Sequence, residues 1–184
     1  EPTGAAAAEE PEAEEFRILV SVARPQRVVA YVRLAKLLGR GSERETVVQV
    51  LNVTHIPDQT PNEVVRETAE KRADRIETLL GESDLDVEYT VEAHICRDIA
   101  FDILQTARND AADRILMGYP EEHQSIAETV EFNAPCGVFF TSNADAIEDL
   151  STINVGAGGG PHHTALLPLV NRLGQAGAEI HVVS

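Results

Sequence analysis

The chain has 184 residues, and its 31 acidic and 15 basic residues give a net charge of −16. This charge argues against nucleic acid or an anionic membrane as a partner, because both need clustered Lys and Arg. Lysine occurs only at Lys36 and Lys71, and acid excess with few lysines favours a protein kept soluble in high salt, where charge repulsion is screened.

Residues 1–15 are rich in glutamate and alanine and contain no basic residue. That composition offers too little apolar surface to offset chain ordering, so a flexible acidic linker is predicted. The chain begins at Glu1 and its only methionine is Met117. We therefore expect a processed or excised piece with a further segment upstream.

Residues 16–142 alternate apolar β-branched runs with amphipathic segments, which predicts one α/β domain. Alternation of this kind is typical of an open parallel sheet with helices on both faces. The run from Val87 to Ile95 alternates strictly, so this strand is expected near a sheet edge. Expected strands are 16–22, 46–53, 87–95, 114–117 and 137–141, and expected helices are 25–39, 62–81, 98–109 and 125–132.

The opening unit of the chain recurs after an acidic connector at residues 143–150. Residues 151–184 again read as strand, turn with proline, helix and strand, and then stop. An internal repeat of this kind indicates tandem domains. We expect the first β-α-β unit of a second, truncated domain, which would need to dock on the first domain or on another chain to cover its edges.

The fourth strand and the segments after it carry a family resemblance. Arg114–Gly118, then Ser125–Glu128, then Ala134–Cys136 leading into the last strand, resemble the universal stress protein family. The resemblance covers residues 16–142, and 151–184 is similar to the first third of a second copy. It implies an adenine nucleotide alpha hydrolase-like fold with strand order 3-2-1-4-5, and dimers through the last strand.

Nucleotide-binding members of that family have a glycine-rich phosphate cradle after the fourth strand. Here Gly118 and Ser125 match the cradle, but Glu121 and Gln124 stand where the other glycines belong. Glycine is needed there because only bare backbone brings several N–H groups close to an anion. The family places an acidic residue near the nucleotide base, and this chain has Ala23 at that position. We therefore expect no cofactor, with ATP or another nucleotide as the alternative.

A second glycine-rich turn follows the first strand of the repeat. Gly156, Gly158, Gly159 and Gly160 lie just before Pro161. Such a turn, leading into a helix, can approach an anion. The alternative is a tight strand-to-helix turn with no ligand. Gly118, Ser125 and these four glycines are the candidate ligand-binding residues.

No constellation in the sequence points to catalysis or to a metal. The six histidines show no ligand spacing, and Ser125, Cys96 and Cys136 have no evident base partner. Both cysteines adjoin apolar strands, which favours small buried side chains. Asp98 and Asp102 are expected to cap and solvate a helix.

The leading hypothesis is a non-catalytic regulatory or interaction domain of universal stress type. Tandem domains of this kind resemble the soluble tails of prokaryotic, haloarchaeal-type amino-acid or cation transporters. That resemblance implies a membrane domain upstream in the same polypeptide, a cytoplasmic location and a homodimer. The alternative is a free-standing tandem stress-response protein that binds ATP or another nucleotide. An enzyme of Rossmann type is disfavoured, because no G-x-G-x-x-G follows the first strand.

Overall fold

The computed structural model describes residues 15–40, 42–57, 62–120, 122–141, 152–156, 170–171 and 179–183. The strands are β1 (Glu15–Ser21), β2 (Glu45–His55), β3 (Glu88–Cys96), β4 (Arg114–Gly118), β5 (Gly137–Thr141), β6 (Thr152–Gly156) and β7 (Glu179–Val183). The helices are the short 3₁₀ turn η1 (Pro25–Arg27), α1 (Val28–Gly39), α2 (Asn62–Gly81), α3 (Ile99–Asn109) and α4 (Gln124–Asn133).

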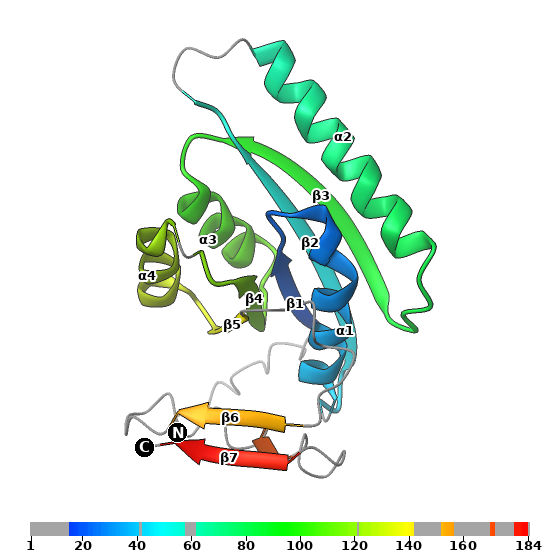
Figure 1. The fold of residues 1–184 in the computed structure, drawn as a ribbon, viewed down its shortest axis with the longest axis vertical. Helices are drawn as coiled ribbons and strands as arrows, with labels where there is room; N and C mark the ends of the chain where they lie inside the picture. The colour runs from blue at the N-terminus through cyan, green and yellow to red at the C-terminus, as the bar shows by residue number, and fades with distance from the viewer. Residues whose placement is uncertain are drawn as a thin grey trace, which may run out of the picture.

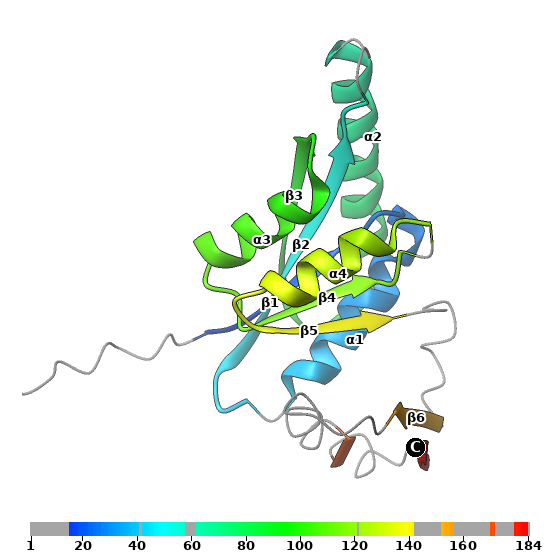
Figure 2. The same cartoon turned by 90° about the vertical axis from the view of Figure 1, so that its left-hand side faces the viewer.

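The first five strands form one parallel sheet in the order β3-β2-β1-β4-β5 (Figure 1). Helices α1 and α2 cover one face, and α3 and α4 cover the other (Figure 2). This arrangement confirms the predicted fold class and strand order. It also confirms that the alternating third strand lies at an edge. Within the described residues, no helix is long and apolar enough to cross a membrane.

Strand β1 is the centre of both halves of the core. Ile18, Leu19 and Val20 have no exposed surface. Ile18 and Val20 pack under α1 and α2, whereas Leu19 packs under α3 with Ile103 and Ile115. Because a parallel strand is covered on both faces, its sequence is continuously apolar rather than alternating.

The starts of α3, α2 and β1 can be compared with the expected ranges. Asp98 lies just before α3, and its carboxylate accepts a hydrogen bond from the Phe101 N–H at 2.9 Å, so its predicted capping role is confirmed. Helix α2 begins at Asn62 and ends at Gly81, which is the range expected from the sequence. Glu15, assigned by composition to the linker, is the first residue of β1.

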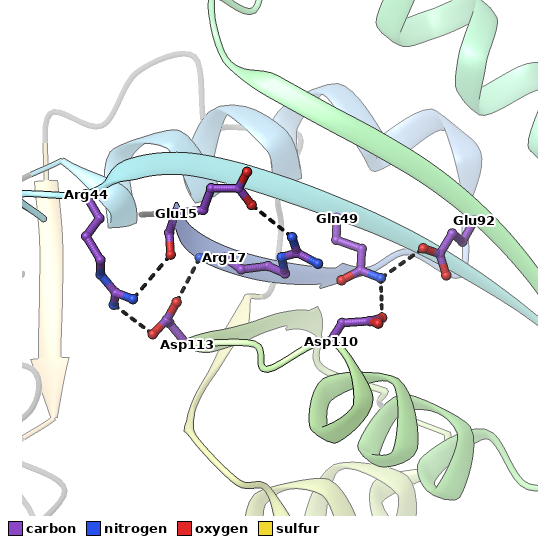
Figure 3. Close-up of polar contacts among 7 residues, drawn as sticks. All are labelled: Glu15, Arg17, Arg44, Gln49, Glu92, Asp110 and Asp113. Atoms are coloured by element: carbon purple, nitrogen blue, oxygen red, sulfur yellow. Dashed lines mark hydrogen bonds and ion pairs between the residues drawn. The ribbon is translucent and has the colours of Figure 1, made fainter. Parts of the chain in front are cut away.

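A polar network joins the amino-terminal halves of the strands, on the side away from the carboxyl ends where open α/β sheets bind ligands (Figure 3). The Asp113 carboxylate accepts hydrogen bonds from the Arg17 N–H at 2.9 Å and from the Arg44 guanidinium at 2.8 Å. On β2 the buried Gln49 amide donates to Asp110 at 2.7 Å. These contacts tie β1 and β2 to the segment that leads into β4, and they leave the carboxyl ends free for other roles.

Strands β6 and β7 form a separate two-stranded parallel sheet, with Thr152 opposite Glu179. Parallel pairing is what a β-α-β unit requires. Between the two strands only residues 170–171 are described, and they are helical. Most of the predicted linker and the whole of the connector lie outside the described residues.

The two helix-ending glycines offer a matched test of the packing. A Cβ on the buried Gly39 would overlap the Thr46 side chain on β2, whereas a Cβ on Gly81 would have no atom within 4 Å. We expect Gly39→Ala to lower the free energy of unfolding by about 1–3 kcal/mol, since Thr46 is short and branched and has little room to move. Gly81→Ala should leave it unchanged or raise it by up to about 1 kcal/mol. Urea unfolding measures both, and equal effects would contradict the packing described.

Candidate functional site

A cavity of about 320 Å³ opens at the carboxyl ends of β1 and β4. The chain leaves β1 toward α1 on one face of the sheet and leaves β4 toward α4 on the other, so the cavity lies at the point where the strand order reverses. We call it the switch-point cavity. Its lining residues are Ser21, Ala23, Arg24, Arg27, Tyr31, Ile99, Ile103, Met117, Gly118, Tyr119, Pro120, Glu122, His123 and Ile126.

The walls of the switch-point cavity differ in character. Ile103 and Ile126, from α3 and α4, form an apolar wall together with Met117 at the end of β4. Arg24 and His123 add polar and basic groups from the two turns. A concave site with an apolar wall and a few polar groups suits a small organic anion.

The turn after β1 is held in place by β2. The side-chain amide of the fully buried Asn52 donates to the Val22 carbonyl oxygen at 2.6 Å, and the Val22 N–H donates to the Leu51 carbonyl oxygen at 2.9 Å. Pro25 then opens η1, where its missing N–H has no cost. These contacts hold the backbone beside Arg24, whose side chain lines the cavity.

Gly118 lines the cavity, but its bare backbone already has a packing partner. A Cβ at this position would overlap the hydroxyl oxygen of Tyr31, a buried side chain from α1. The close approach of Tyr31 is therefore sufficient reason for glycine here. Ser125, the other residue that matches the family's cradle, is exposed in the first turn of α4 and does not line the cavity.

The second predicted site is only partly visible. Gly156 is the last residue of β6. Gly158, Gly159 and Gly160 lie outside the described residues.

The two cysteines are half-buried rather than buried as expected. Burial, followed by the negative charge of Asp102, raises the pKa of the Cys96 thiol to about 11, although a hydrogen bond from the Asp98 backbone lowers it. Burial also raises the pKa of the Cys136 thiol. Neither is poised as a thiolate nucleophile at neutral pH.

His94 is the one histidine that the structure places in a carboxylate cluster within the described residues. Its Nδ1 lies 2.8 Å from Asp102 and its Nε2 lies 3.4 Å from Glu92. Asp102, expected only to solvate its helix, therefore also links α3 to β3. Among the described residues, no group of three or more His, Cys, Asp or Glu side chains is arranged to hold a metal ion.

A second, more open cavity of about 510 Å³ lies between η1 and α2. We call it the basic groove. The approach of Arg24 to Lys71 and Arg75 from the turn after β1 could not be predicted from the sequence. Its lining residues are Ala23, Arg24, Pro25, Gln26, Thr68, Lys71, Arg72 and Arg75. Ala23 and Arg24 line both cavities, so the two are neighbours.

Neither a protein-family model nor a curated protein matches the sequence. Solved structures do match the fold. Universal stress protein UspA from Lactobacillus plantarum is 18% identical with a TM-score of 0.53, over 69% of this chain and 97% of that one. The hypothetical protein MJ0577 is 16% identical with a TM-score of 0.52, over 70% and 97%.

A universal stress protein family protein from Arabidopsis thaliana, solved with AMP bound, is 14% identical with a TM-score of 0.51. That match covers 73% of this chain and 99% of the other. At these identities the likeness concerns the fold. The chain therefore has the α/β fold of universal stress proteins.

Gly118 and Tyr31 allow a test of why glycine stands at the cavity. We expect Gly118→Ala to lower the free energy of unfolding by about 1–3 kcal/mol, because the new methyl group meets the Tyr31 hydroxyl. Tyr31→Phe removes that oxygen, so the double variant should cost less than the two single changes added together. Additive costs in urea unfolding would show that Tyr31 is not the reason for the glycine.

Proposed function

We propose that this chain is a non-catalytic regulatory domain that binds an adenine nucleotide in the switch-point cavity. The observation that carries the proposal is the cavity itself, which lies where open α/β sheets bind ligands. The AMP bound to the Arabidopsis protein supports the choice of ligand. The glycine replacements at Glu121 and Gln124 affect only the binding of the phosphate. The apolar wall of the cavity can still bind the adenine base.

The proposed pose follows from the character of the two walls. The base would lie against Met117 and Ile103, because a flat apolar ring is best desolvated there. The ribose and first phosphate would then point toward Arg24, whose guanidinium can hold a phosphate through two parallel hydrogen bonds. Glu122 also lines the cavity and opposes an anion, so the phosphate should lie on the side away from it.

The proposal of a non-catalytic role rests on the side chains near the cavity. Ser125 is exposed and outside the lining, and the raised thiol pKa of Cys96 disfavours a nucleophile. His123 lines the cavity without a hydrogen-bonding partner among the described side chains that would orient it as a base. Binding without turnover is the simplest use of this arrangement.

Isothermal titration calorimetry of AMP into the full chain tests the proposal. We expect one saturable site per chain. Ile99→Trp, which places a large ring in the cavity wall, should weaken it by at least about tenfold, or about 1.4 kcal/mol. Val64→Trp is the matched control, because Val64 is 55% exposed on α2 and does not line the cavity. Absence of heat with the unmodified chain, or equal affinity in Ile99→Trp, would contradict the proposal.

The second candidate is an interaction domain that binds no nucleotide. Tyr31 occupies the space above Gly118, and Glu122 faces the cavity. Both features are expected if the site has lost its ligand. Absence of binding in the same titration would favour this candidate.

We also propose the setting in which the domain works. The regulated protein is a transporter for amino acids or cations, encoded upstream in the same polypeptide, and the domain lies at the cytoplasmic face as a homodimer in a high-salt cell. The support is the charge of −16 and the acidic composition of residues 1–15. Sedimentation velocity in concentrated KCl should show a dimer, and a monomer at all protein concentrations would count against this assembly. A coding sequence that encodes no hydrophobic helices upstream of this chain would contradict the proposed link to a transporter.

A further inference from the structure

The basic groove is unusual for so acidic a chain. It is lined by Arg24, Lys71, Arg72 and Arg75, and none of its lining residues is acidic. These are four of the 15 basic residues, in a chain with 31 acidic ones. A concentration of one sign of charge in a concave surface raises the local concentration of the opposite ion.

The sequence of α2 separates its charges by side. Thr68, Lys71, Arg72 and Arg75 follow the spacing i, i+3, i+4, i+7, so they share one face of the helix. That face is directed at η1, which packs beside α2. By the same periodicity Glu63, Glu70, Asp74 and Glu77 fall on the other side, whereas the fifth exposed acid of α2, Glu67, lies at the border of the basic face next to Lys71.

Most of the positive charges in the basic groove are not neutralised by ion pairs with other described residues. Lys71 binds the Glu67 carboxylate at 2.6 Å, and this hydrogen bond lowers the pKa of Glu67. By contrast, Arg24, Arg72 and Arg75 form no side-chain hydrogen bond or ion pair with other described residues. Arg72 is half-buried. Three guanidinium groups therefore surround one concave surface without partners among the described residues. Their combined positive charge favours the binding of an anion.

We infer that the basic groove binds the oligophosphate of a nucleoside di- or triphosphate. Arg24 lines both cavities, so a nucleotide whose base lies in the switch-point cavity can extend its outer phosphates past Arg24 toward Arg72 and Arg75. A guanidinium group can donate two parallel hydrogen bonds to two oxygens of one phosphate, and it stays charged at all physiological pH values. Arginine side chains thereby replace the backbone N–H groups that a glycine cradle would supply. The nucleotide form of the inference rests on the proposed function, whereas the oligophosphate site does not.

The test uses tripolyphosphate as the probe, titrated calorimetrically into the full chain at low salt. We expect one site, and we expect the double change Arg72→Gln and Arg75→Gln to weaken it by at least about tenfold. Arg66→Gln is the matched control, because Arg66 is exposed on α2 and does not line the groove. Circular dichroism establishes that each variant keeps its helix content. Arg24→Gln provides a second loss of charge that leaves α2 unchanged.

The outcomes separate the groove from the nucleotide site. Binding that is lost in the double variant and in Arg24→Gln but kept in Arg66→Gln supports the inference. No binding of tripolyphosphate by the unmodified chain, or an equal loss in Arg66→Gln, overturns it.

AMP and ATP titrations then distinguish the two failures. AMP binding that survives the double change while ATP loses its advantage over AMP places the outer phosphates in the groove. Tripolyphosphate binding without any AMP binding supports an oligophosphate site in the basic groove and contradicts nucleotide binding in the switch-point cavity.

Discussion

The parallel pairing of β1 with β2 on one side and β4 on the other is the constraint on which the rest of the structure depends. Since β1 is buried on both faces, its apolar residues hold two cores together at once. The pairing also sends the chains leaving β1 and β4 to opposite faces of the sheet. A gap at their carboxyl ends is the geometric consequence, and it contains the switch-point cavity.

The turn after β1 has the greatest influence on function, because it separates the two cavities. Asn52 holds the Val22 carbonyl from the neighbouring strand, and Pro25 starts η1 directly afterward. Arg24 is thus fixed between an apolar pocket on one side and the basic face of α2 on the other. A ligand that combines an apolar ring with several phosphates matches this sequence of surfaces, which is why we place its phosphates on α2 rather than on the turn after β4.

The sequence predicted the layers of the fold well and the site less well. Short apolar runs between amphipathic segments located all five strands of the main sheet. The strict alternation of apolar and polar residues from Val87 onward identified the edge strand. Both signals depend on local periodicity. Gly118 was noticed as a cradle residue. Its contact with Tyr31 depends on the packing of α1 against β4, which no local pattern encodes. The basic groove was missed for the same reason: the spacing of Lys71, Arg72 and Arg75 is visible in the sequence, but the approach of Arg24 requires the fold.

A crystal structure of the full chain grown with ADP would test most directly whether arginine side chains hold the phosphates. We expect the base against Met117 and Ile103, with the terminal phosphate within hydrogen-bonding distance of Arg24 and of Arg72 or Arg75. Phosphates bound instead at the turn between Gly118 and Ser125 would contradict this arrangement, since backbone rather than arginine would then hold the anion. An ADP-free cavity at saturating ligand would contradict nucleotide binding altogether.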